Sequence, residues 1–97
     1  MGTVNRSAEY AVVYDISSDS ERRKVDTLLQ GFGFRIQKSV FECRLRKSDL
    51  SDLKRRLTKL KIMTGFIKIY RLEFSSKQAV IGENPPPNPD SEAAFIV

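Results

Sequence analysis

The sequence contains no histidine. Histidine is the side chain whose unperturbed pKa lies nearest neutrality, and it is the commonest ligand of transition metals in proteins. Its absence excludes a histidine general base and any metal site built on imidazole. Catalysis, if there is any, must therefore use carboxylates, hydroxyls, lysine or a hard metal ion.

Cysteine is almost as scarce, because Cys43 is the only one among the 97 residues. A single thiol excludes an intramolecular disulfide and a multi-cysteine metal site, and it fits a reducing compartment. No apolar run approaches the ~20 residues that a membrane-spanning helix needs, and no signal peptide opens the chain. We expect a cytoplasmic protein that does not enter a membrane.

Acidic residues are scarce in the middle of the chain. The net charge is +5, but residues 22–61 hold 13 Lys and Arg against four Asp and Glu, whereas residues 78–97 hold three acids and no base. A basic body with an acidic end is typical of a polyanion binder that has a separate protein-facing segment. The alternative is a solvated Lys/Arg surface that keeps the protein soluble.

The first part of the chain predicts a strand followed by a helix. Residues 8–15 are β-branched and aromatic on both alternating faces, which is typical of a buried central strand. Ser18 and Glu21 have the spacing of a capping box that opens a helix, and Gly31 and Gly33 are expected to end it. The apolar face of this helix repeats at helical spacing on Val25, Leu28, Leu29 and Phe32.

The second part predicts further strands around a second helix. Residues 34–45 are β-rich and long enough for two strands, or for one strand bent near Ser39. Ser48 is a plausible N-cap. The helix after it has its apolar stripe on Leu50, Leu53, Leu57 and Leu60. Residues 65–74 alternate as a fourth strand, and residues 79–81 form a short fifth.

The order β-α-β-β-α-β predicts an α+β protein of ferredoxin-like topology, with an antiparallel sheet, helices on one face and a short extra C-terminal strand. We expect one domain over residues 1–82, followed by a proline-rich linker and an apolar tail over residues 83–97. The strands contain more apolar residues than a single face packed against helices can bury. We therefore expect a second copy of the chain to pack sheet against sheet. These positions are Tyr10, Val12, Tyr14, Phe41 and the strand from Gly65.

Two motifs, YDISSDSERRKV and then GFGFRIQKSVFECRL, resemble the CRISPR-associated protein 2 family in order and spacing. The resemblance covers residues 10–82 and extends weakly to the terminal FIV. It implies a prokaryotic, ferredoxin-like homodimer at the centre of the spacer-acquisition complex, between dimers of the integrase subunit, CRISPR-associated protein 1. It also implies contact with DNA and, for several members, magnesium-dependent endonuclease activity on single-stranded RNA or double-stranded DNA.

The resemblance assigns the metal-site role to Asp15, at the end of the first strand. Further residues of the family's active region correspond to Tyr14, Arg22, Arg35 and Phe41. Lys24 stands where some members have a second arginine. The chain departs from the family at residues 63–66, where members commonly carry an acidic residue before the fourth strand.

One aspartate per chain is too few for a tight magnesium site, because Mg²⁺ is held by one or two carboxylates together with substrate phosphates and water. If the two-fold axis of the dimer passes near the end of the first strand, two Asp15 carboxylates can share one ion. The alternative interpretation makes Asp15 a turn residue that binds nearby backbone N–H groups.

We expect nucleic acid to contact a larger set of basic residues. The set consists of Arg22, Arg23, Lys24, Arg35, Lys38, Lys54, Arg55 and Lys59. On the second helix, together with Arg56 and Lys61, these side chains form either a phosphate track or a solvated helix face. The apolar end AAFIV is either disordered or adds a strand to the integrase subunit.

Several functions stay open at this point. The protein is a metal-dependent nuclease, a structural DNA-binding adaptor in spacer integration, or a toxin-type ribonuclease of the same fold outside CRISPR systems. An RNA-recognition module of the same topology is disfavoured, because the aromatic-rich signature of such a sheet is absent. Substituting Asp15 separates the nuclease from the adaptor.

Overall fold

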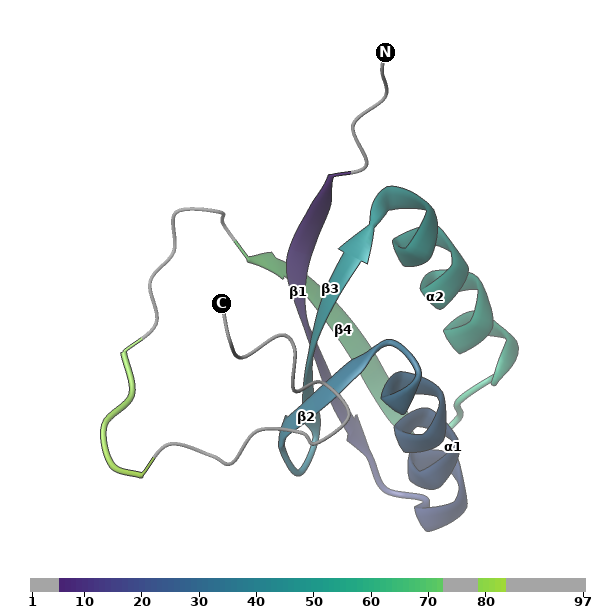
Figure 1. Cartoon of the computed structure of the whole chain (residues 1–97). Coiled ribbons are helices and arrows are strands. Elements are labelled where there is room, and N and C mark those ends of the chain that lie inside the picture. Colours follow the sequence, from purple (N-terminus) through teal and green to yellow (C-terminus); the bar gives the residue numbers. More distant parts are fainter. Residues whose placement is uncertain (1–5, 73–78, 84–97) are drawn as a thin grey trace.

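The computed structural model describes residues 6–72 and 79–83 (Figure 1). The elements follow in the order β1 (Ser7–Ile16), α1 (Asp19–Gln30), β2 (Gly33–Gln37), β3 (Val40–Arg46), α2 (Lys47–Lys59) and β4 (Gly65–Leu72). The α+β class and the βαββαβ order are confirmed. Residues 34–45 form two strands, and the chain turns between them at Lys38 and Ser39.

The strands form one antiparallel sheet in the order β2-β3-β1-β4. β1 therefore lies between β3 and β4, as its two apolar faces predicted. Both helices cover the same face of the sheet (Figure 1). The other face, called here the open face, is covered by neither of the two described helices.

The core lies between the sheet and the helices. Even-numbered side chains of β1 and odd-numbered side chains of β3 point into it, because paired residues share a face. These are Tyr10, Val12, Tyr14, Ile16, Phe41, Cys43 and Leu45, and they meet Val25, Leu29, Leu53 and Leu57 from the helices.

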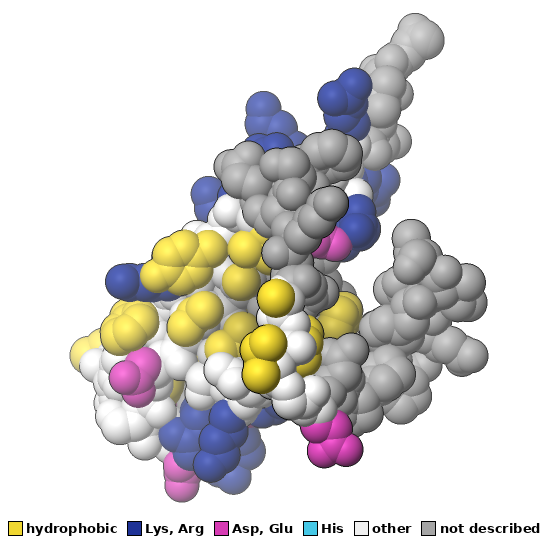
Figure 2. Space-filling view, turned by 90° about the vertical axis from the view of Figure 1, so that its left-hand side faces the viewer, with side chains coloured by type: hydrophobic (Ala, Val, Ile, Leu, Met, Phe, Trp, Pro, Cys, Tyr) yellow, Lys and Arg dark blue, Asp and Glu magenta, His cyan; other side chains and the backbone are white. Residues whose placement is uncertain are grey.

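The expectation that Tyr10, Val12, Tyr14 and Phe41 leave apolar surface for a second copy was wrong, because the helices bury all four. The open face nevertheless carries an apolar patch (Figure 2). By strand register it carries Ala11, Val13, Phe34, Val40, Phe66, Tyr70 and Leu72. Strand register also places Glu9, Asp15, Glu42, Arg44 and Lys68 on this face. Phe66 is 48% exposed and Tyr70 is 49% exposed.

Helix α1 starts as predicted, since the Ser18 hydroxyl accepts a hydrogen bond from the Glu21 amide at 3.3 Å. Gly31 is its C-cap. Gly33 does not end the helix, contrary to expectation, but opens β2. A Cβ there would lie 2.1 Å from the Glu42 carbonyl oxygen and 2.6 Å from Cys43 Sγ, so glycine is required for β2 to approach β3.

Helix α2 starts earlier than predicted. Its N-cap is Arg46 and not Ser48. The Arg46 amide donates to the Asp49 carboxylate at 3.1 Å, and this bond satisfies a backbone donor that the helix leaves free. The predicted stripe is confirmed, because Leu53 and Leu57 are buried while Leu50 and Leu60 pack against the core.

The predicted fifth strand at residues 79–81 is not formed, because these residues are exposed and pair with no strand of the described chain. A strand needs a neighbour for its backbone groups, and residues 79–81 pair with neither edge strand of the described sheet, β2 or β4. Two predictions fall partly outside the described residues: the last two residues of the fourth strand, 73–74, and residues 84–97 of the linker and tail. Neither described helix is long and apolar enough to cross a membrane.

Candidate metal and nucleic-acid site

Asp15 lies near the end of β1, with its side chain exposed on the open face. It pairs with Phe66 on β4 and follows Val13 on the same side of the strand. The carboxylate therefore stands at the edge of the apolar surface, on the side of the sheet that the helices leave uncovered.

Gly65 fixes the backbone at Asp15. A Cβ on Gly65 would lie 1.8 Å from the Asp15 carbonyl oxygen and 2.9 Å from the Cα of Ile16. Any other residue would push β4 away from β1 at this point. Beside them, the Lys68 ammonium lies over the Phe66 ring, 5.6 Å from its centre, so the carboxylate has an aromatic and a cationic neighbour on β4.

The turn after Asp15 is fastened to the residues that precede β4. The Thr64 carbonyl accepts from both the amide and the hydroxyl of Ser17, each at 3.0 Å. The Glu21 carboxylate accepts from the amides of Met63 and Thr64, each at 3.0 Å, and from the Thr64 hydroxyl at 2.6 Å. These bonds, led by that of the Thr64 hydroxyl, lower the pKa of Glu21.

Glu21 therefore does not complete the predicted capping box. Instead of reaching back to the Ser18 amide, it binds the chain before β4, and the Ser18 amide donates to Thr64 Oγ1 at 3.0 Å. The departure from the family pattern at residues 63–66 thus has a local role: Thr64 joins the two segments that flank Asp15.

Arg22 also serves this turn. Its Nη1 donates to the Ile16 carbonyl at 2.8 Å, and its Nη2 pairs with Asp19. The side chain is 37% exposed, and both terminal nitrogens of its guanidinium already have partners within the chain. In this arrangement Arg22 ties α1 to the end of β1.

Tyr14, Arg35 and Phe41 form a separate cluster on the helix side of the sheet. Tyr14 and Phe41 stack with ring centres 6.4 Å apart, and the Arg35 guanidinium lies 5.2 Å from the centre of the Phe41 ring. Asp26 of α1 joins them: the Tyr14 hydroxyl donates to it, and Arg35 Nη2 pairs with it at 3.2 Å.

Burial, and secondly the hydrogen bond to Asp26, raise the pKa of Tyr14 above its ordinary value. The hydroxyl is therefore neutral throughout the ordinary range of pH. Since adjacent residues of a strand point to opposite faces, Tyr14 and Asp15 do not converge. The structure groups Tyr14, Arg35 and Phe41 with Asp26, and it leaves Asp15 on the other side of the sheet.

The sequence interpretation did not find four of the residues that build these sites. Asp26, Thr64 and Gly65 were not singled out, and Glu21 was given only a capping role. Asp26 follows Arg22 by one helical turn, on the side of α1 that meets the sheet, but a lone aspartate at that spacing carries no signal. Gly65 directly before a strand was a usable signal, because glycine at a strand end often marks close backbone approach.

The carboxylates of one chain do not build a metal site alone. Within residues 6–72 and 79–83, no three Asp, Glu, Cys or His side chains are grouped closely enough to hold a metal ion. A single exposed carboxylate fits Mg²⁺, which keeps most of its water and binds phosphate oxygens as well.

The basic residues lie mostly on the outer sides of the helices and turns. Arg23 and Lys24 are exposed on α1, Lys38 is exposed in the β2–β3 turn, and Lys54 and Lys59 are exposed on α2. On α2, Asp52 pairs with both Arg55 and Arg56, which offsets part of the positive charge of the proposed track.

The fold and this arrangement define a ferredoxin-like α+β protein with an exposed carboxylate at the end of its central strand. Sequence comparison then identifies the family: the model of the CRISPR-associated protein Cas2 family matches residues 9–80. The chain belongs to the Cas2 family, and the resemblance found in its two motifs is confirmed.

Individual relatives agree with this assignment. The CRISPR-associated endoribonuclease Cas2 1 of Chloroflexus aurantiacus is 38% identical over 91 residues, which cover 90% of this chain and 98% of that protein. The CRISPR-associated endoribonuclease Cas2 3 of Synechocystis is 49% identical over 51 residues, which cover 53% of this chain and only 55% of that relative. The crystal structure of a hypothetical protein from Thermus thermophilus has a TM-score of 0.74 and 38% identity, over 84% of this chain and 99% of that one.

Proposed function

We propose that the protein is a magnesium-dependent endonuclease of RNA or DNA that acts as a homodimer in CRISPR spacer acquisition. The observation that carries the proposal is the exposed Asp15 carboxylate, held at the end of β1 by the close approach of Gly65. Relatives that bear the name endoribonuclease support the reaction class.

The open face supports the homodimer. Phe66 and Tyr70 on this face are about half exposed in one chain, and burying such apolar surface is favourable by about 25 cal/mol per Å². A second copy related by a two-fold axis near the end of β1 brings two Asp15 side chains together. The dimer then supplies the two carboxylates that one chain lacks.

These two Asp15 carboxylates would hold the Mg²⁺ ion, each providing oxygen ligands. When bound, the ion supplies Lewis-acid stabilisation of the charge that develops on the scissile phosphate. The residues of the chain itself do the rest: Gly65 and the Thr64 contacts fix the carboxylates, and Lys68 contributes a positive charge near the phosphate backbone.

Exposed Lys54, Arg55 and Lys59 on α2, with Arg23 and Lys24 on α1, support a sequence-independent contact with the phosphate backbone. Such binding should weaken steeply as salt rises, because each neutralised phosphate releases counterions. The integrase subunit, CRISPR-associated protein 1, is the expected protein partner. Membership of the Cas2 family supports this expectation.

A structural DNA-binding adaptor is the second candidate. The observation in its favour is the absence of a three-carboxylate group from the described residues. An adaptor and a nuclease make different predictions for Asp15, since only a nuclease needs its carboxylate for turnover.

The test is cleavage of single-stranded RNA and double-stranded DNA by wild type and Asp15→Asn, with Mg²⁺ or with EDTA. We expect Asp15→Asn and EDTA each to reduce the rate by about 100-fold. This factor corresponds to a loss of about 2.7 kcal/mol of transition-state stabilisation. Glu83→Gln removes one exposed carboxylate outside the helices and strands; it is the matched control and should cleave as wild type does. Cleavage that is indifferent to both changes would refute the nuclease. DNA binding without any turnover in the wild type would leave the adaptor.

A further inference from the structure

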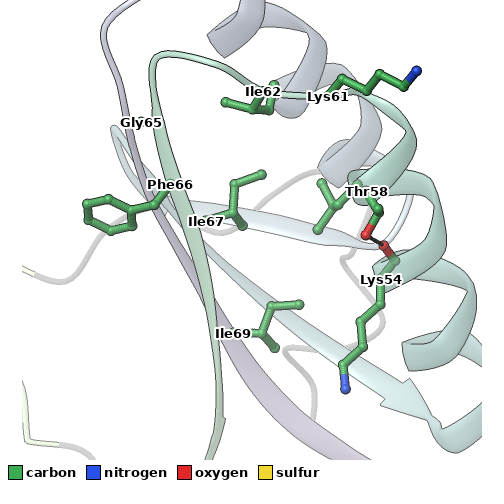
Figure 3. A pocket seen from close by; sticks show the side chains of 9 residues that line it. Lys54, Thr58, Lys61, Ile62, Gly65, Phe66, Ile67 and Ile69 are labelled. Carbon is green, nitrogen blue, oxygen red and sulfur yellow. Dashed lines mark hydrogen bonds between the residues drawn. The ribbon is translucent and has the colours of Figure 1, made fainter.

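A groove of about 490 Å³ runs between α2 and β4 (Figure 3). Its floor is apolar, formed by Leu57 of α2, Ile62 of the connection, and Ile67 and Ile69 of β4. In Figure 3 the two β4 isoleucines point toward α2, while Phe66 points away to the open face. Gly65 and Phe66 also line the groove, so it borders the open face but opens toward α2.

The rim of the groove is positively charged. Lys54 and Lys61 line it, and neither has an ion-pair partner among the described side chains. Thr58 also lines it, but its hydroxyl already donates to the Lys54 carbonyl at 2.8 Å. The groove thus fits an occupant that is apolar and carries negative charge beside its apolar part.

The C-terminal part of this chain has that chemistry. Residues 90–97 read DSEAAFIV, with Asp90 and Glu92 directly before an apolar run. Residues 73–89 connect this segment to the end of β4. At about 3 Å per residue, they reach much farther than the ~17 Å that separate Leu72 from Ile67 along the strand.

We infer that residues 90–97 of the same chain dock in the groove between α2 and β4, with the apolar residues on the isoleucine floor and the acids near Lys54 and Lys61. Docking removes Phe95 and Ile96 from water, which supplies the driving force. The inference does not depend on nuclease activity. In this arrangement the apolar tail binds its own chain, and a partner that binds the tail must first displace it from the groove.

A cysteine pair tests the docking. In the full chain, Thr58→Cys with Ala94→Cys should form an intramolecular disulfide under mild oxidation, seen as a mobility shift on a non-reducing gel. Native Cys43 does not interfere, because it is buried and burial raises the pKa of its thiol to about 11. The matched control is Thr27→Cys with Ala94→Cys, since Thr27 is exposed on α1 and lies outside the groove. Equal rates for the two pairs would overturn the inference.

Charge reversal tests the role of the rim. Lys54→Glu in the Thr58→Cys/Ala94→Cys background should slow disulfide formation about threefold or more, since an attraction becomes a repulsion. Lys59→Glu makes the same charge change on α2 outside the groove and should leave the rate unchanged. Equal slowing by both would overturn the contact.

Two other occupants are outcomes of the same assay. A disulfide that joins two chains would assign the groove to the tail of a second copy and overturn docking within one chain. A Thr58→Cys/Val80→Cys pair that crosslinks two chains would assign the groove to residues 79–81 of the second copy, and would likewise overturn it.

Discussion

Gly65 determines where the Asp15 carboxylate leaves the sheet. The contact of 1.8 Å that a Cβ would make with the Asp15 carbonyl is far shorter than a van der Waals distance, and the obstacle is backbone, which cannot rotate away. Strand β4 must shift if any side chain is added. The position of the candidate site therefore depends on a residue that takes no part in its chemistry.

We predict that Gly65→Ala lowers the free energy of unfolding by about 2–4 kcal/mol and shifts the amide resonances of Asp15 and Ile16. Urea denaturation and NMR check the two effects. Gly31→Ala is the control, because Gly31 has a helical φ of −81° and an added Cβ would lie 3.4 Å from the Leu28 carbonyl oxygen. An unchanged Gly65→Ala protein would contradict the close approach.

Glu21 makes the stability of the protein depend on pH. Its pKa is lower in the folded chain than in the unfolded one, so its stabilising contribution is present above the unfolded value of about 4.3 and is lost as pH falls through the folded value. We predict that Glu21→Gln lowers the urea midpoint at neutral pH and that the difference from wild type narrows below about pH 4. A difference that stays constant into acid would contradict the role of the carboxylate charge.

Among the elements, α2 shows how a cap can be misassigned from sequence. Ser48 and Asp49 are neighbours, and both residue types cap helices. The bond from the Arg46 amide to the Asp49 carboxylate starts the helix one turn before that carboxylate. The difference arises because a carboxylate can reach back to the N-cap amide from the third helical position.

The two substitutions at this cap have opposite expected results. Asp49→Ala should cost about 1 kcal/mol of stability, as the loss of a capping partner typically does. Ser48→Ala should stay within about 0.5 kcal/mol of wild type. Thermal or urea unfolding of the two variants measures both values, and a larger loss for Ser48→Ala would restore the cap predicted from sequence.

Periodicity predicted the helices and the strand order because each helix has one apolar stripe and each strand is short. It could not predict which face of β1 meets the helices, since Tyr10, Val12 and Tyr14 alternate with Ala11 and Val13 and both sets are apolar. The set with the larger side chains, Tyr10, Val12 and Tyr14, faces the core. Nor could it predict the meeting of Tyr14, Asp26 and Arg35, which depends on how α1 packs on β1 and β2.

At the scale of the whole molecule, the proposed homodimer depends on the open face. Its centre contains Glu42, whose pKa is raised by burial and secondly by Glu9, between apolar neighbours on β1 and β2. The edge carries Phe66 and Tyr70. Two half-exposed aromatic rings on one sheet face are typical of an interaction surface.

We predict that Tyr70→Glu converts the homodimer to a folded monomer. Tyr70 pairs with Ala11 on the open face and lies about 13 Å along the strand from Phe66, the partner of Asp15. Sedimentation velocity measures the mass, and circular dichroism checks the fold. Thr27→Glu, which adds the same charge on α1, should remain dimeric. A dimeric Tyr70→Glu protein would place the interface elsewhere.

The central claim is that Asp15 works only when a second chain brings its own Asp15 to the site. The rate of Mg²⁺-dependent RNA and DNA cleavage per chain, compared between wild type, Tyr70→Glu and Asp15→Asn, tests it most directly. The account predicts that monomeric Tyr70→Glu, with Asp15 intact, falls to the level of Asp15→Asn. A monomer that cleaves at the wild-type rate per chain would contradict it.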